Sequence, residues 1–128
     1  MGYNAGVLTN PQPSIRRFAG AADAPSSVDN GNIVISTGAA PALVTLPLAA
    51  GELIALLPGF NANYIGKGAG LVSFAAGVGD SIYGYGLNGY FTVSPHAMVG
   101  QGAFVSVVLE SQDPVTGVRV WALCGGLA

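Results

Sequence analysis

The residues with the clearest capacity for chemistry are four carboxylates, Glu52, Asp80, Glu110 and Asp113. Glycoside hydrolysis uses two carboxyl groups about 5 to 10 Å apart, so a pair drawn from these four is a candidate active site. All four, however, lie at the ends of apolar runs or in turns, where carboxylates normally accept hydrogen bonds from the backbone. We interpret them as structural and expect no enzyme. The alternative is a small β-barrel enzyme or ligand carrier that uses Glu52, Asp80 or His96.

The other candidates for catalysis or cofactor binding lack the residues that such sites need. His96, the only histidine, stands in a Ser-Pro-His turn without a Gly-x-Ser-x-Gly nucleophile elbow. The segment 66–70, Gly-Lys-Gly-Ala-Gly, is similar to a phosphate-binding loop, but Gly68 occupies the place of the required Ser or Thr. The single cysteine, Cys124, excludes an internal disulfide and a cysteine-based zinc site, and we expect it to be buried. The sequence therefore predicts no catalytic, cofactor-binding or metal-ligating residue.

Tyrosines concentrate in one short segment of the chain. Tyr83 and Tyr85 fall on the same side of a predicted strand because side chains alternate along a strand, and Tyr90 follows shortly after. Tyrosine offers apolar area with a polar tip, which suits core packing, a subunit interface or a carbohydrate-binding platform. We expect these three tyrosines to contact a partner protein, with glycan binding as the alternative.

Charged residues make up only 8% of the 128-residue chain, whereas ordinary soluble domains have about 25%. Apolar residues reach 51%, but 20 glycines and eight prolines interrupt them, so no segment offers the roughly 18 consecutive apolar residues of a membrane span. The net charge of −2, without a basic cluster, argues against nucleic acid as a partner. A monomer this poor in charge would expose apolar patches typical of interaction surfaces, so the composition predicts an assembly subunit.

The first 32 residues differ from the rest of the chain. They contain three prolines among small and polar residues, without sustained periodicity, and residues 1–10 lack the basic and apolar regions of a signal peptide. We expect an extended N-terminal arm over 1–32, with one short extended piece at 14–18, in a protein made in a cytoplasm. The arm residues expected to contact a neighbouring subunit are Tyr3, Val7, Leu8, Ile15, Arg16, Arg17 and Phe18.

From residue 33 onward, short runs rich in β-branched and aromatic residues alternate with turn residues. The pattern predicts an all-β protein, a jelly-roll-like β-sandwich of about eight short strands over 33–128. The last two strands are apolar on both faces, as expected where one face covers the core and the other a partner. A loose internal repeat relates 44–47 to 91–95. The strands are expected near 33–37, 43–47, 53–57, 71–75, 82–85, 90–93, 103–109 and 118–124.

The order of these motifs resembles a module common in the virion proteins of tailed phages. Similar modules occur as trimerising units of fibres and as small jelly-roll head decoration, or cement, proteins. The resemblance covers residues 33–124. It is carried by Thr45-Leu46-Pro47, Gly51 with an apolar strand, Gly79-Asp80-Ser81-Ile82-Tyr83-Gly84, Gly100-Gln101-Gly102 with the strand to Leu109, and a final strand with Trp121.

This resemblance implies a structural protein of the virion, assembled in the host cytoplasm. Such a protein binds the outside of the phage head and stabilises contacts between major capsid subunits. The implied partners are copies of the same chain, as a trimer or otherwise a dimer, and the major capsid protein. A short chain with an extended arm fits a decoration protein better than a long fibre. The alternative is a tail-fibre or tail-tip receptor-binding module that uses Tyr83, Tyr85 and Tyr90 against glycans.

Overall fold

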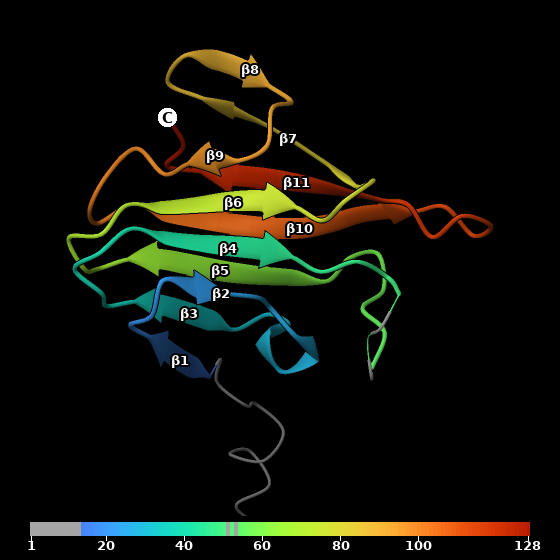
Figure 1. Ribbon diagram of the computed structural model, residues 1–128, viewed down its shortest axis with the longest axis horizontal. Helices are drawn as coiled ribbons and strands as arrows, with labels where there is room; N and C mark the ends of the chain where they lie inside the picture. The colour runs from blue at the N-terminus through green and yellow to red at the C-terminus, as the bar shows by residue number, and fades with distance from the viewer. Residues whose placement is uncertain (1–13, 51, 53) are drawn as a thin grey trace, which may run out of the picture.

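The computed structural model describes residues 14–50, 52 and 54–128, which form two facing β-sheets with one short 3₁₀ helix (Figure 1). The prediction of an all-β sandwich is confirmed. The large sheet has seven strands in the order β1 (Ile15–Phe18), β3 (Ile33–Ser36), β5 (Asn61–Gly66), β10 (Phe104–Gln112), β11 (Arg119–Gly125), β7 (Ser81–Gly86) and β8 (Gly89–Phe91). The small sheet has four, in the order β2 (Ala22–Asp23), β4 (Ala42–Leu46), β6 (Val72–Ala76) and β9 (His96–Ala97). The helix η1 (Ser27–Asp29) connects β2 to β3.

The first six strands form three turns of a coil, in which each turn contributes one strand to each sheet. Within the large sheet β1, β3 and β5 run parallel, and within the small sheet β2, β4 and β6 do the same. The second and third turns are offset by 30 residues throughout, since Ile33 pairs with Asn63 and Leu46 with Ala76. The structural repeat therefore relates 33–46 to 63–76. The segments of the predicted repeat begin in different sheets, one in β4 and the other in β8.

Close stacking of the coil turns explains the glycines of segment 66–70. A Cβ on Gly68 would overlap the carbonyl oxygen of Gly38, and a Cβ on Gly70 would overlap that of Ala40. The backbone N–H of Gly70 donates to the carbonyl of Gly38 at 3.1 Å. This segment is therefore a turn stacked on the preceding turn, and its glycines permit the close approach of two backbones.

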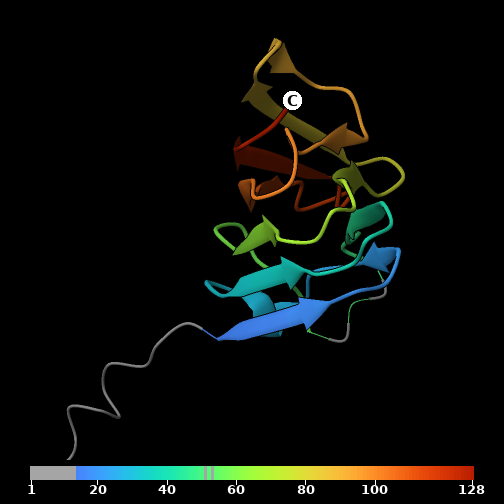
Figure 2. The ribbon, with the colours of Figure 1, turned by 90° about the vertical axis from the view of Figure 1, so that its left-hand side faces the viewer.

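The remaining strands complete the two sheets. β10 and β11 form a long antiparallel hairpin between β5 and β7, the β7–β8 hairpin extends the large sheet, and β9 adds antiparallel to β6. β1 and β2 lie at one end of the molecule and the β7–β8 hairpin at the other (Figures 1 and 2). Among the described residues, five strand pairs are parallel and four antiparallel, so both sheets are mixed, whereas a jelly roll is built from antiparallel Greek keys.

The core lies between the sheets and is formed by every second residue of their strands. In β4, for example, Leu43 is exposed while Val44 is fully buried. Trp121 and Phe60 meet edge to face at the centre of this core, with ring centroids 6.1 Å apart. The largest fully buried apolar side chains are Trp121, Tyr64, Phe74, Leu46, Ile82 and Met98.

One predicted strand is wrong, and three real strands were not predicted: the two-residue strands β2 and β9 and the longer strand β5. Residues 54–57 form no strand, although they are apolar, and the chain enters the large sheet only at β5. There Asn61 and Asn63 lie on the outer face while Ala62 and Tyr64 are buried, so the alternation is present but carried by small and polar residues. Because residues 53–57 are more apolar than 61–66, the sequence favoured a strand at 53–57 over one at β5.

Residues 14–32, which the sequence groups with the arm, form the first turn of the coil. The extended piece expected at 14–18 is β1, paired with β3, and β2 pairs with β4. Tyr3, Val7 and Leu8 lie outside the described residues.

Candidate functional site

Each of the four carboxylates considered for catalysis has a structural partner. Glu52 accepts a hydrogen bond from the Arg119 guanidinium, and Asp80 accepts one from the backbone N–H of Arg119 at 2.9 Å. Glu110 accepts a hydrogen bond from the Tyr83 hydroxyl, which raises the pKa of that phenol. The arrangement supports the interpretation that these groups hold strands and turns together.

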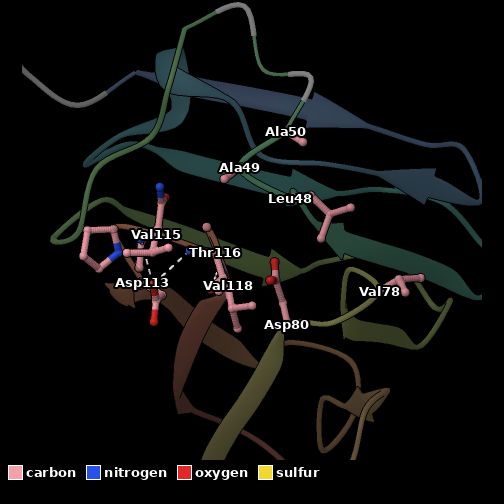
Figure 3. A pocket seen from close by; sticks show the side chains of 12 residues that line it. Leu48, Ala49, Ala50, Val78, Asp80, Asp113, Val115, Thr116 and Val118 are labelled. Carbon is pink, nitrogen blue, oxygen red and sulfur yellow. Dashed lines mark hydrogen bonds between the residues drawn. The ribbon is translucent and has the colours of Figure 1, made fainter.

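A pocket of about 490 Å³ lies between the loop after β4 and the turn after β10 (Figure 3). Asp80 and Asp113 line it together with apolar side chains such as Val118. The Asp113 carboxylate accepts hydrogen bonds from the backbone N–H groups of Thr116 at 3.0 Å and Val115 at 2.8 Å, which lower its pKa. These bonds stabilise the ionised form, so Asp113 caps its own turn and is poorly suited to deliver a proton.

His96 and Cys124 lie away from this pocket. The His96 ring stacks on Phe91, and its Nε2 lies 2.6 Å from the carbonyl oxygen of Ala128. Cys124 is exposed on β11, which corrects the expectation that it is buried. Among the described residues, no three His, Cys, Asp or Glu side chains come together as a metal site. The described part of the chain also contains no helix with the length and hydropathy that crossing a bilayer requires.

The Arg119 cluster, formed by Arg119, Glu52 and Gln112, holds the loop after β4 against the end of β11. The Arg119 side chain is fully buried. Its Nε donates to Gln112 at 2.9 Å, and its Nη atoms donate to Glu52 and to the carbonyls of Pro47 and Leu56 at 3.0 and 3.2 Å. A buried cation needs this full set of acceptors, so the cluster is structural.

A second cluster closes the first turn of the coil. Arg16 of β1 donates to Asp23 at 2.7 Å and to Asp29 at 3.0 Å, and these bonds, Asp23 first, raise the pKa of its guanidinium. The Tyr64 hydroxyl donates to Asp23 at 2.9 Å. Phe18 packs edge to face on Tyr64, with ring centroids 6.5 Å apart. Arg16 and Phe18 thus make contacts within the chain.

This cluster predicts a stability loss in alkali that depends on Tyr64. Burial and then the charge of Asp23 raise the pKa of Tyr64, whereas an unfolded tyrosine ionises near pH 10. The stability that its proton contributes is therefore complete below about pH 10 and is lost as the pH rises above it. Urea unfolding between about pH 9 and 11.5 measures this effect. Above about pH 10, we expect the free energy of unfolding to fall about 1.4 kcal/mol per pH unit more steeply in the wild type than in Tyr64→Phe. Equal losses in both proteins would contradict it.

The side of the large sheet that faces away from the small sheet, here called the outer face, is not covered by any helix or strand of the described residues. Three rows of residues cross it, each made of residues that pair between neighbouring strands. Ile35 and Ile65 belong to the first row, Ile15 and Ile33 to the second, and Val108 and Ala122 to the third. In full, the rows are Arg17-Ile35-Ile65-Phe104, Ile15-Ile33-Asn63-Ser106-Cys124, and Asn61-Val108-Ala122-Tyr83.

The outer face has an aliphatic half and an aromatic half. The isoleucine half consists of Ile15, Ile33, Ile35 and Ile65 on β1, β3 and β5, and Ile15 is 51% exposed. The tyrosine half consists of Tyr83, Tyr85 and Tyr90 on β7 and β8. Tyr85 and Tyr90 are cross-strand partners, 73% and 67% exposed, and the Tyr83 and Tyr90 rings lie 6.4 Å apart.

A shallow pocket of about 400 Å³ lies over the tyrosine half, where Ala122 and Cys124 of β11 form its floor beside the three rings. The structure thus brings the predicted residues Ile15, Arg17, Tyr83, Tyr85 and Tyr90 onto one face, and the charged side chains among the described residues of this face are Arg17 and Glu110.

Sequence reasoning did not select Ile33, Ile35, Ile65 and Phe104 as surface residues. β3 and β10 carry apolar residues on both faces, which is the signal that could have identified Ile33, Ile35 and Phe104, whereas β5 around Ile65 gives no such signal. Comparison of the chain with models of protein families, with curated proteins and with solved structures found no match.

Proposed function

We propose that the protein is a structural subunit of a phage virion, a decoration protein that binds the outside of the head and stabilises contacts between major capsid subunits. The observation that carries the proposal is the outer face, a surface that spans a seven-stranded sheet, is apolar apart from Asn61, Asn63 and a few serines, and bears Arg17 and Glu110 as its charged groups. A face of this size and polarity is typical of an interaction surface. The sequence resemblance to phage virion modules supports the particular assembly.

The interior of the protein supports a passive, cross-linking role. The candidate catalytic groups are engaged in hydrogen bonds that hold turns and loops, and two ion-pair clusters stiffen the sandwich. A rigid subunit with an apolar assembly surface adds a modest burial of surface at each of its contacts in the particle. Symmetry multiplies that gain over many copies of the shell.

The copy number of this chain in purified virions tests the proposal. Quantitative mass spectrometry is expected to find it in hundreds of copies, close to stoichiometric with the major shell protein. Heads that lack the protein are expected to release their DNA at a lower temperature and to recover on addition of the purified chain. A few to a few tens of copies per particle would contradict the head assignment.

A tail-tip module that binds glycans is the second candidate, and the pocket over Tyr83, Tyr85 and Tyr90 favours it. Exposed tyrosines beside a shallow apolar pocket suit stacking against a sugar ring. This candidate predicts that Tyr85→Ala with Tyr90→Ala abolishes adsorption to the host and leaves the heat stability of heads unchanged. Because both side chains are largely exposed, the double variant is expected to fold.

A further inference from the structure

We propose that the outer face binds the outer face of a second copy of this chain, in a two-fold dimer with its axis close to β10. This inference rests on the proposed function only in taking the outer face as an assembly surface. A face that meets the same face of a second copy makes an isologous contact, and such a contact closes with two copies.

The order of the strands makes this contact self-complementary. β10 is the central strand of the large sheet, with β1, β3 and β5 on one side and β11, β7 and β8 on the other. Rotation about an axis along β10 therefore places the isoleucine half of one copy on the tyrosine half of the other. β1 then lies opposite β8 of the second copy, and β3 opposite β7, so that Ile33 meets Tyr85 twice.

The charged groups of the face are compatible with this arrangement. Arg17 lies on the edge strand β1, two residues after Ile15, which the rotation brings opposite Tyr90 of β8, and an arginine beside an aromatic ring can pack favourably over it. Glu110 lies near the far end of β10, so an axis along β10 brings it opposite Glu110 of the second copy, and each carboxylate accepts a hydrogen bond from its own Tyr83. The two carboxylates are exposed at the rim, where water and salt screen their repulsion.

The area decides between this dimer and one that uses the isoleucine half alone. The face is about 29 Å wide, from six spacings of about 4.8 Å between its seven strands, and about 17 Å long, the length of roughly five residues in a strand. The buried area is therefore roughly 500 Å² per copy, or about 1,000 Å² in total. That total is about the lower limit for a specific interface. A contact over the isoleucine half alone would bury about half as much, so the full face is required.

The experiment measures the mass of the purified wild-type chain by sedimentation velocity from about 1 to 100 µM, the range in which an interface at this size limit is expected to dissociate. We expect a transition from 12.7 kDa to twice that mass. Ile33→Lys and Tyr85→Glu should each raise the dissociation constant at least about tenfold. Mixing the two variants should restore a dimer, because the introduced lysine of one variant then faces the introduced glutamate of the other.

Two measurements keep this test independent of misfolding. Leu43→Lys changes a 40% exposed residue on the outer side of the small sheet and is expected to leave the dimer intact. Fluorescence of the buried Trp121 reports that each variant is folded.

A further measurement tests the contact in the wild type. Alkylation of the exposed Cys124 should slow as the protein concentration rises, because Cys124 lies within the contact.

Several results would overturn the dimer. They are a wild type that stays monomeric at 100 µM, a trimer, a dimer that both variants leave intact, and a mixture that stays monomeric. A monomer whose binding to heads is lost in Ile33→Lys would identify the shell protein as the occupant instead. Such a monomer would leave the decoration role standing, whereas a dimer found at a few copies per virion would overturn that role alone.

Discussion

Glu52→Gln is expected to lower the free energy of unfolding by about 3 kcal/mol. The substitution keeps the size of the side chain but removes the negative charge beside a guanidinium with no exposure to solvent. The cation of Arg119 would then have neutral acceptors alone, namely the new amide oxygen at position 52, Gln112 and the carbonyls of Pro47 and Leu56. Urea unfolding followed by the fluorescence of Trp121 measures the change.

The double variant Glu52→Gln with Arg119→Met separates this ion pair from general damage. It removes both charges, so it should be less destabilised than the sum of the two single variants. Glu110→Gln is the matched control, because Glu110 is exposed and its loss should cost no more than about 0.5 kcal/mol. If Glu52→Gln behaves like this control, the Arg119 cluster does not hold the loop after β4.

Gly70→Ala is expected to destabilise the protein by about 2 kcal/mol or more, since the new methyl group overlaps backbone atoms of Ala40. Backbone atoms in a stacked turn cannot move aside as a flexible side chain can. The third turn of the coil would have to separate from the second, with strain on the hydrogen bond from Gly70 to Gly38. The same urea experiment measures the loss.

Gly20→Ala is the control for the coil, because a Cβ at Gly20 meets no atom within 4 Å and its φ lies outside the left-handed region. Its stability should change by no more than about 0.5 kcal/mol, or rise slightly as the unfolded chain loses freedom. Equal effects of the two substitutions would mean that the turns are not packed as closely as the structure shows.

These stability predictions bear on function through the outer face. Its isoleucines stand on β1, β3 and β5, which are the three turns of the coil in the large sheet. The first two rows of the outer face run across these strands, so any change that separates the coil turns would also interrupt those rows. Gly70→Ala should consequently weaken assembly as well as folding, whereas Gly20→Ala should affect neither.

Local patterning was sufficient to predict the class of fold and most of its strands. The segments 33–37, 43–47, 71–75 and 103–109 lie close to β3, β4, β6 and β10, because alternation and turn residues act within a few positions. Local patterning failed at β5, because the residues that alternate between its two faces include asparagines and an alanine. The pairing of β5 with β3 on one side and β10 on the other supplies its stability.

The sequence by itself determined that the chain is all-β, poor in charge and rich in strands with two apolar faces. Only the tertiary structure decided that β1 to β6 form a parallel coil, that Arg119 is buried among acceptors far along the chain, and that the isoleucines and tyrosines share one face. Pairing register and burial arise from contacts between distant segments. The free energies of those contacts depend on which strands meet, and the periodicity of a single strand carries no information about its neighbours.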